Sequence, residues 1–110
     1  MTPHNTFVVF TTASNLSEAR RIANQLVRAR VAACVNIVPR IDSVYWWKGK
    51  VTRGAEALLI IKTSRSRMKL LSRKIQTLHS YEVPEVIALP VSAGSPAYLR
   101  WLEESLRISA

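Results

Sequence analysis

Apart from His4 and the two methionines, two side chains in this sequence could bind a soft metal ion. Cys34 is the only cysteine, and His79 lies in the second half of the chain. Thiolate and imidazole groups are suitable ligands for copper and zinc. A closed zinc site needs four ligands, and the sequence has neither a Cys-x-x-Cys motif nor two neighbouring histidines. One chain is therefore not expected to complete such a site, whereas an oligomer could draw ligands from two chains.

Both residues also have a purely structural interpretation. Cys34 lies in an apolar run, where cysteine often serves as a small buried hydrophobe. His79 follows a predicted helix, and an imidazolium group interacts favourably with the C-terminal end of a helix dipole. The sequence alone leaves the ligand role and the structural role open for each.

A second group of side chains predicts a polar pocket. Glu56 and Lys62 share strand parity with apolar neighbours, and Glu85 shares parity with Tyr81. Ionisable groups on apolar strand faces are costly unless they are paired or open to a cleft. The predicted pocket contains Glu56, Lys62, His79 and Glu85, with Tyr81 or Trp46 as a wall. The alternative is a set of structural ion pairs at a subunit interface.

A catalytic nucleophile would need a general base and an orienting group. Cys34 could be the nucleophile and His79 the general base. The sequence offers no group to orient the base and no loop that would stabilise an oxyanion. We therefore expect no enzymatic activity.

A regular succession of predicted elements positions these residues. Continuous apolar runs indicate strands, whereas apolar residues three and four apart indicate helices. Pro39 and Pro84 each predict a bulge or an edge position, because proline cannot donate to a strand ladder. In chain order we predict a strand over 6–12, a helix of about four turns from 15, a strand over 31–47 with its turn at 48–50, a return strand from 51, a helix over 66–78, a strand over 81–91 and a helix that opens at 95.

This order predicts an α+β fold, a ferredoxin-like βαββαβ sandwich with a long β-hairpin and an extra C-terminal helix. No linker, repeat or low-complexity stretch interrupts the pattern. The sequence therefore predicts one domain over residues 1–110, which is long enough to bury a core without disulfides or metals.

The tip of the predicted hairpin indicates an oligomer. Tyr45, Trp46 and Trp47 are consecutive, and successive strand residues point to opposite faces, so the two tryptophans cannot both face one core. Exposed aromatic patches commonly mark association sites, and a two-stranded extension has little stability alone. The alternative is that one tryptophan packs on the core and the other is half-exposed.

The charge of the chain raises the question of an anionic partner. Sixteen Lys and Arg against seven Asp and Glu give a net charge of +9. Nine of the sixteen basic residues fall on or beside the first two predicted helices, and no aromatic RNA-binding pattern appears on the strands. We expect a solvated charged face and no specific nucleic-acid partner, with salt-sensitive adhesion to polyanions as the remaining nucleic-acid hypothesis.

The sequence also bears on the compartment. A single cysteine excludes an internal disulfide and suits a reducing compartment. No secretory leader pattern is visible, and no apolar run is long enough to span a membrane. We therefore expect a cytoplasmic protein without a membrane partner.

Five stretches of the sequence, taken in order, resemble those of one protein family. Residues 31–39 read VAACVNIVP, 43–50 read SVYWWKGK, 58–63 read LLIIKT, 79–91 read HSYEVPEVIALPV, and 98–102 read YLRWL. On these motifs the chain is identified as a member of the CutA family, and the resemblance extends from Phe7 to about Leu106.

The resemblance implies a PII-related ferredoxin-like domain that forms a homotrimer, with the long hairpins pairing with neighbouring subunits. It also implies an association with divalent cation tolerance, with copper(II) or another divalent cation as ligand, and neither an organic cofactor nor an agreed reaction. Our hypothesis is a homotrimeric binding protein whose intersubunit cleft takes a metal ion or a small ligand. The alternative is a non-catalytic trimeric interaction or signalling module with no specific metal site.

Two positions depart from the copper-site pattern that the resemblance implies. Bacterial members with a proposed copper site have a cysteine before a Thr-Ala pair at the end of the first strand, and that place is Thr11 here. They also have two adjacent histidines before the tyrosine of the fourth motif, and those places are Leu78 and His79. His79 and Cys34 are therefore the candidate metal ligands of this chain.

Overall fold

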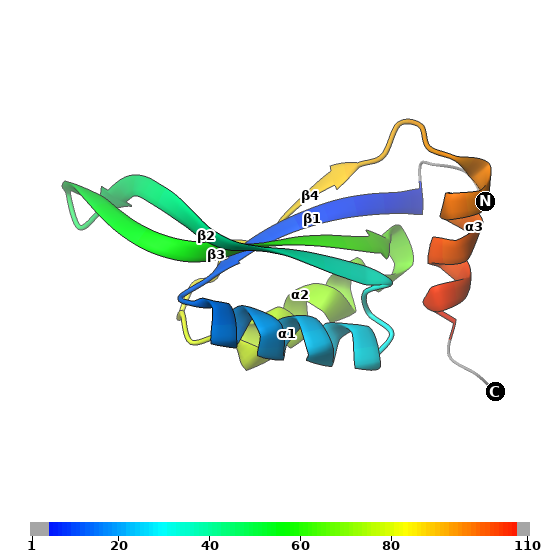
Figure 1. The fold of residues 1–110 in the computed structure, drawn as a ribbon, viewed down its shortest axis with the longest axis horizontal. Coiled ribbons are helices and arrows are strands. Elements are labelled where there is room, and N and C mark those ends of the chain that lie inside the picture. Colours follow the sequence, from blue (N-terminus) through cyan, green and yellow to red (C-terminus); the bar gives the residue numbers. More distant parts are fainter. Residues whose placement is uncertain (1–4, 108–110) are drawn as a thin grey trace.

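The computed structural model describes residues 5–107, which form one four-stranded antiparallel sheet and three α-helices (Figure 1). The sheet has the order β2-β3-β1-β4, which is the order of a ferredoxin-like βαββαβ fold. The predicted fold is therefore confirmed. The elements are β1 (Thr6–Ala13), α1 (Leu16–Arg28), β2 (Cys34–Trp47), β3 (Lys50–Ser64), the short 3₁₀ segment η2 (Arg65–Arg67), α2 (Met68–Leu78), β4 (Ile87–Pro90) and α3 (Pro96–Ser105).

Helices α1 and α2 lie side by side against one face of the sheet and close the main core (Figure 1). Asn15 caps α1, because its side-chain oxygen accepts a hydrogen bond from the Glu18 backbone at 2.8 Å. The central apolar residues of both helices are buried against odd-numbered residues of β1 and β3, and Met68 and Leu78 at the two ends of α2 are half-buried. The fully buried large side chains of this core include Val9, Ile22, Leu26, Leu59, Ile61, Leu71 and Ile75.

Helix α3 lies across one end of the sheet and forms a second small core with the residue that precedes β2 (Figure 1). Leu102 and Leu106 pack against Ala33 there. Ser95 and the following proline open the helix, as predicted. Two arginine side chains hold the last turn of α3. Arg30, just after α1, donates to the Ser105 carbonyl oxygen at 2.9 Å, and Arg67, just before α2, donates to that of Leu106 at 2.7 Å.

Strands β2 and β3 form a long hairpin that leaves the body of the molecule (Figure 1). The turn is tight because Lys48 and Gly49 have φ values of 50° and 77°, the left-handed pair that a two-residue hairpin turn requires. The register shifts between Val38 and Ile41, so the bulge predicted at Pro39 is confirmed. The radius of gyration of 14.6 Å exceeds the roughly 13 Å expected for a compact domain of this length.

The predicted strand over 81–91 is wrong for its first six residues. Only Ile87–Pro90 pair with β1, and residues 81–86 form a bent loop. Side chains already occupy the backbone donors of this loop, since the Ser80 N–H binds Glu18 and the Tyr81 N–H binds His79. The strand-parity argument that placed Tyr81 and Glu85 on one face therefore fails.

Three other predicted boundaries differ from the structure. Strand β2 begins at Cys34 rather than at residue 31, because the N–H groups of Val31 and Ala32 bind the Leu26 carbonyl oxygen and close the end of α1. The first turn predicted for the second helix is the 3₁₀ segment η2. The return strand begins at Lys50, one residue earlier than predicted.

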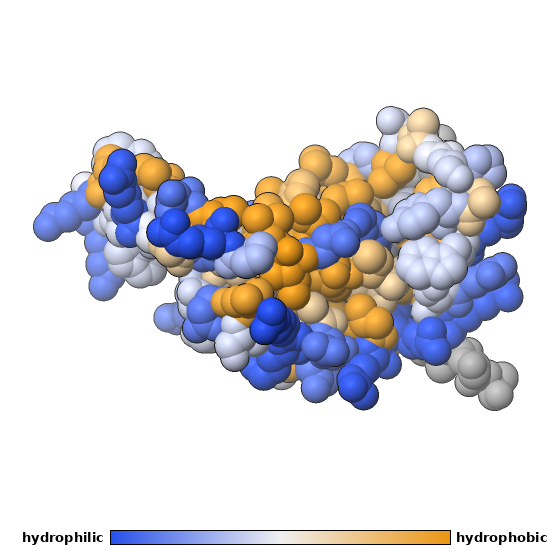
Figure 2. All heavy atoms as spheres, in the orientation of Figure 1, coloured by the Kyte–Doolittle hydropathy of each residue, from blue (hydrophilic) through white to orange (hydrophobic). Residues whose placement is uncertain are grey.

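The face of the sheet opposite α1 and α2 is apolar and largely open. Because side chains alternate along a strand, Val8, Phe10, Leu58 and Ile60 point away from the two helices, and all four remain half-buried. At the β4 edge, Ile87 and Leu89 are 54% and 52% exposed. Figure 2 shows hydrophobic side chains gathered over the middle of the molecule, between the hairpin and α3. We name this surface, with its β4 edge, the open face.

Candidate functional site

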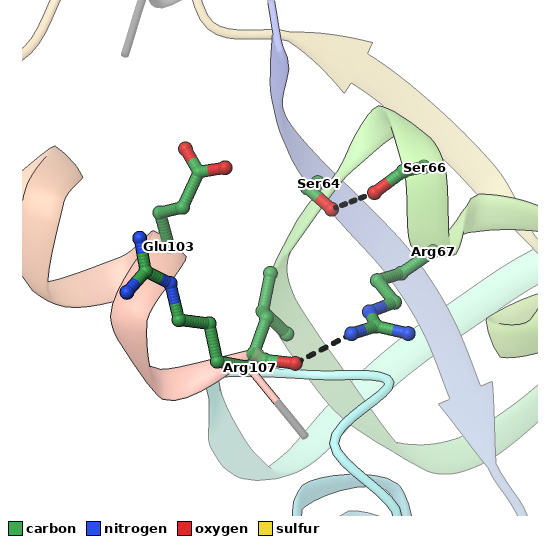
Figure 3. A pocket seen from close by; sticks show the side chains of 6 residues that line it. Ser64, Ser66, Arg67, Glu103 and Arg107 are labelled. Atoms are coloured by element: carbon green, nitrogen blue, oxygen red, sulfur yellow. Dashed lines mark hydrogen bonds between the residues drawn. The ribbon is translucent and has the colours of Figure 1, made fainter. Parts of the chain in front are cut away.

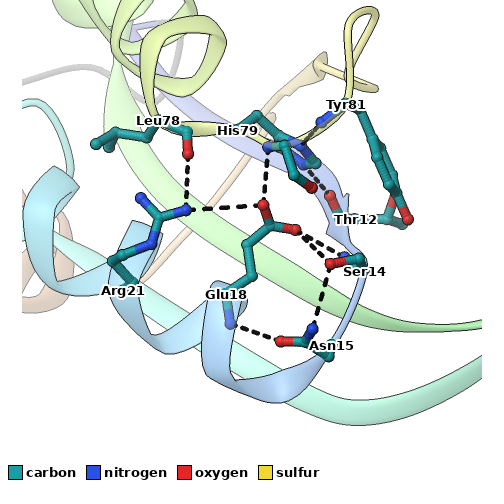
Figure 4. Close-up of polar contacts among 9 residues, drawn as sticks. Thr12, Ser14, Asn15, Glu18, Arg21, Leu78, His79 and Tyr81 are labelled. Atoms are coloured by element: carbon teal, nitrogen blue, oxygen red, sulfur yellow. Dashed lines mark hydrogen bonds and ion pairs between the residues drawn. The ribbon is translucent and has the colours of Figure 1, made fainter.

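The site is built around His79, the residue that ends α2 and whose ring reaches across to β1 (Figure 4). Its Nδ1 accepts a hydrogen bond from the Tyr81 N–H at 3.0 Å, and its Nε2 lies 2.6 Å from the Thr12 carbonyl oxygen. Because Nδ1 accepts, the proton must be on Nε2, which donates to Thr12. Both ring nitrogens are therefore committed, and a metal ion could bind His79 only after one of these bonds broke.

Tyr81 connects the loop to the sheet. Its ring centroid lies 4.6 Å from that of His79, and its hydroxyl donates to Oε2 of Glu56 on β3 at 2.8 Å. Burial raises the pKa of Tyr81, and the neighbouring Glu56 carboxylate raises it further because it stabilises the protonated hydroxyl. Tyr81 therefore stays a hydrogen-bond donor at neutral pH. His79, Tyr81 and Glu56 form a continuous row, which we name the His79 row.

Glu18 fixes the position of this row from α1 (Figure 4). Its carboxylate accepts hydrogen bonds from the Ser14 N–H at 2.9 Å, the Ser14 hydroxyl at 2.8 Å and the Ser80 N–H at 2.8 Å. Burial alone would raise the pKa of Glu18, but the hydrogen bonds from Ser14 and Ser80 outweigh it and lower the pKa to about 2. The group is thus an anion at neutral pH, and it ties the start of α1 to the loop after α2.

Arg21 completes this tether. Its guanidinium group lies 3.7 Å from the Glu18 carboxylate and donates to the Leu78 carbonyl oxygen at 2.8 Å. Glu18 is not among the site residues predicted from the sequence. Its link to Ser80 joins residues that are 62 positions apart, and the local pattern of the sequence contains no signal for it.

The structure brings together three of the residues predicted for the polar pocket and separates the others within one chain. Lys62 lies on β3 six residues from Glu56, which is about 20 Å along a strand. Trp46 pairs with Val51 near the hairpin tip, about 17 Å from Glu56 by the same measure. Glu85 is exposed in the loop before β4. Of the predicted polar pocket, one chain therefore assembles only the row of His79, Tyr81 and Glu56.

Cys34 lies at the other end of the sheet from His79. It pairs with Lys62 across β2 and β3, and its Sγ is 3.8 Å from Oδ1 of Asn36, to which the Lys62 ammonium group also donates. His79 contacts Thr12, whose partner on β3 is four residues from Lys62, or about 13 Å along the strand. The two predicted metal ligands therefore do not meet within one chain.

No complete metal site exists within residues 5–107. This part of the chain contains no group of three or more His, Cys, Asp or Glu side chains close enough to share an ion. Thr11, which stands where the family pattern has a cysteine, is fully buried, and its hydroxyl oxygen has no hydrogen-bond partner. A metal site that used His79 would need ligands from another chain.

Two hollows lie elsewhere on the described surface. One, of about 360 Å³, follows the hairpin between Arg40 and Arg53, where the Arg40 guanidinium group is 3.2 Å from Asp42. The other, of about 80 Å³, lies where η2 meets the end of α3 and is lined by Ser64, Ser66, Arg67, Glu103, Leu106 and Arg107 (Figure 3). Neither contains a residue predicted for the polar pocket or the metal site.

Helix length also limits how the described chain could meet a bilayer. None of the helices within residues 5–107 is both long and apolar enough to cross a membrane.

The sequence matches a known family over most of its length. A family model described as "CutA1 divalent ion tolerance protein" matches residues 7–105. A divalent-cation tolerance protein CutA from Thermus thermophilus is 45% identical over 98 residues, which cover 89% of this chain and 95% of that protein. A chloroplastic protein CutA 1 from Oryza sativa is 50% identical over 102 residues. These residues are 93% of this chain but 58% of the rice protein, so the chain spans little more than half of that relative.

Solved structures of similar proteins share this fold. The crystal structure of CutA1 from Oryza sativa superposes with a TM-score of 0.92 at 48% identity and covers 96% of both chains. The structure of a periplasmic divalent cation tolerance protein CutA from Archaeoglobus fulgidus gives a TM-score of 0.90 at 34% identity, over 93% of this chain and 99% of that one. The whole described fold, including the hairpin and α3, is thus common to these proteins.

Proposed function

Because this chain belongs to the CutA1 divalent ion tolerance family, we propose that it is a homotrimeric binding protein. In this proposal it takes a divalent metal ion, with copper(II) as the first candidate, or a small ligand in a cleft between subunits that includes the His79 row. The observation that carries the proposal is a sheet covered by its own helices on one face only, with the His79 row beside its two central strands, β1 and β3.

The open face and the hairpin support self-association. Strands β2 and β4 are the outer strands of the sheet, so each presents backbone donors and acceptors on one side. The hairpin carries Val44, Trp46 and Val51 at 61%, 74% and 63% exposure, and a two-stranded extension of this kind is marginally stable by itself. A second chain would cover these apolar side chains. The number of three subunits comes from the family resemblance.

The His79 row supports a ligand site between subunits. Glu56 and Tyr81 are half-buried and already joined by a hydrogen bond, so the row presents a fixed carboxylate and a fixed ring at the surface of one chain. One chain supplies too few free ligands for a transition metal, because both nitrogens of His79 are hydrogen-bonded. A neighbouring chain seated against the row would add the missing groups.

Native mass spectrometry of the metal-stripped protein tests this proposal. A trimer of the 12.4-kDa chain has a mass of about 37 kDa, and titration with copper(II) and zinc(II) should add a whole number of ions per chain. The His79→Ala variant should lose these ions, whereas Glu104→Gln, which changes an exposed carboxylate on α3, should keep them. Uptake that His79→Ala does not reduce would overturn the placement of the site.

The second candidate is a trimeric interaction module with no specific metal site. The hydrogen bonds of both His79 ring nitrogens to Tyr81 and Thr12 favour this second candidate, because they hold the loop without a metal ion. A trimer that takes up no ion specifically would support this candidate. A monomer at micromolar concentration would contradict both candidates.

We propose the cytosol as the compartment, because the single cysteine, Cys34, is half-buried and free and suits a reducing environment. The names of similar proteins include a chloroplastic and a periplasmic one. Cell fractionation of the tagged protein checks this assignment, and recovery in a periplasmic extract would contradict it.

A further inference from the structure

The positive charge of the chain is concentrated in one layer of the fold. Residues 14–31 and 65–78, which contain α1, η2 and α2 and which we name the helix layer, hold nine of the sixteen Lys and Arg residues but one of the seven Asp and Glu residues. The helix layer therefore has a net charge of +8, and the rest of the chain has +1. Its basic residues are Arg20, Arg21, Arg28, Arg30, Arg65, Arg67, Lys69, Arg73 and Lys74.

The one carboxylate of the helix layer offsets only one of these nine positive charges, because Glu18 lies 3.7 Å from the Arg21 guanidinium group. Glu18 is 8% exposed and accepts hydrogen bonds from Ser14 and Ser80. Seven of the nine basic side chains are exposed, and the other two, Arg67 and Lys74, are half-buried. Figure 2 shows hydrophilic side chains along the lower side of the molecule, where α1 lies. The exposed surface of the helix layer therefore carries a large excess of positive over negative charge.

The arrangement of these charges opposes the stability of α2. Lys69 and Arg73 are four residues apart on one helix face, where like charges repel. Lys69 also lies in the first turn of α2, which has no acidic residue, although a helix N-terminus favours anions. Folding gains nothing from this pattern, whereas an anionic partner that bound along the layer would neutralise it.

The helix layer matches a polyphosphate better than a lipid surface. A helix that binds in a membrane interface inserts its apolar face into the lipid, but the apolar faces of α1 and α2 are already buried against the sheet, with Ile22, Leu26, Leu71 and Ile75 at 0% exposure. Seven of the nine basic residues are arginines, whose planar fork of donors suits phosphate oxygens.

The residues of the layer also indicate which nucleic acid it fits. No Phe, Tyr or Trp occurs in residues 14–31 or 65–78, so the layer has no ring on which an unpaired base could stack. Helix α1 has 13 residues and is about 20 Å long, a length over which a duplex presents roughly a dozen phosphates. We propose that the helix layer binds the phosphate backbone of double-stranded nucleic acid without reading its sequence.

A pair of charge-matched variants tests this proposal. The layer variant Lys69→Gln/Arg73→Gln/Lys74→Gln removes three charges from α2, and the control Lys50→Gln/Arg53→Gln/Arg100→Gln removes three from β3 and α3. Both lower the net charge from +9 to +6. Fluorescence anisotropy with labelled 24-bp DNA and RNA duplexes, between 50 and 200 mM NaCl, gives the affinity and its salt dependence. Circular dichroism confirms that each variant is folded.

The proposal predicts that the layer variant binds the duplexes at least about tenfold more weakly at low salt and that its slope of log K against log salt falls by roughly two to three. The control variant should bind like the unmodified protein. Equal losses in the two variants would show that only net charge matters and would overturn the assignment to the helix layer. Absence of duplex binding at 50 mM NaCl, or binding only to vesicles that contain phosphatidylserine, would overturn the proposal itself.

Discussion

The two faces of the sheet have similar apolar strands but different surroundings. On the helix-covered face, Val9, Leu59 and Ile61 are fully buried by α1 and α2. On the open face, their neighbours Val8, Leu58 and Ile60 are only half-buried, and at the β4 edge Leu89 is 52% exposed. The strands are continuous apolar runs, which is the pattern of a sheet that is covered on both faces. The chain itself supplies one cover, and in the proposed trimer other chains would supply the second.

The largest expected effect on the free energy of unfolding is on β3, where the adjacent residues Ile60 and Ile61 point to opposite faces of the sheet. Ile61→Ala should lower the free energy of unfolding by about 3 kcal/mol, because the cavity forms inside a fully packed core. Ile60→Ala should lower the free energy of unfolding by as much only while the subunits are associated, because association would bury Ile60. Its effect should therefore be smaller when the protein is diluted. Urea unfolding at two protein concentrations measures the destabilisation by each variant. Equal destabilisation by the two variants at both concentrations would contradict a difference between the faces.

Glu18→Gln should have the next largest effect, at about 2 kcal/mol near neutral pH, because a buried charge-assisted network loses its anion. The pKa of Glu18 is lowered from 4.5 to about 2 by its hydrogen bonds. Its contribution is therefore fully present above pH 4.5 and is lost as the pH falls through 2. In thermal melts between pH 7 and pH 2, the difference in stability between wild type and Glu18→Gln should therefore decrease as the pH falls below 4.5.

An exposed carboxylate provides the control for this pH dependence. Glu104→Gln on α3 should change the free energy of unfolding by less than about 0.5 kcal/mol at any pH. A stability difference between wild type and Glu18→Gln that stayed constant from pH 7 to pH 2 would contradict the assigned pKa.

Two buried threonines on the helix-covered face provide the smallest effects, with opposite signs. The Thr11 hydroxyl has no hydrogen-bond partner, so Thr11→Val should stabilise the protein by about 1 kcal/mol. The Thr63 hydroxyl donates to the Val31 carbonyl oxygen at 2.7 Å, so Thr63→Val should destabilise it by a similar amount. Chemical denaturation of the two variants compares them directly. A loss of stability for Thr11→Val would indicate a bound partner for that hydroxyl.

The sequence predicted the elements that follow local chemistry. The cap at Asn15, the turn at Lys48 and Gly49, the bulge at Pro39 and the start of α3 at Ser95 are all set by neighbouring residues, and the structure has each of them. The strand predicted through Tyr81 failed because two side chains, the distant Glu18 and the nearby His79, accept hydrogen bonds from the Ser80 and Tyr81 N–H groups where the loop begins. A strand pattern cannot contain this information.

The candidate site was less predictable than the fold. Sequence reasoning placed Glu56, Tyr81 and His79 together, and the structure joins them. It also added Lys62 on strand parity and Trp46 as a wall, although parity gives a face of the sheet and not a position along it. The tether between Glu18 and Ser80 depends on how α1 and α2 pack, which no local pattern specifies.

The most direct test of the account compares two exposed leucines. Leu89 on the open face and Leu70 on α2 are 52% and 48% exposed, so Leu89→Asp and Leu70→Asp are the same change at similar exposure in one chain. Sedimentation velocity at micromolar concentration gives the mass of each variant. If other copies of the chain cover the open face, Leu89→Asp should sediment as a monomer and Leu70→Asp as the wild-type assembly. Equal masses for the two variants, or a monomeric wild type, would contradict the account.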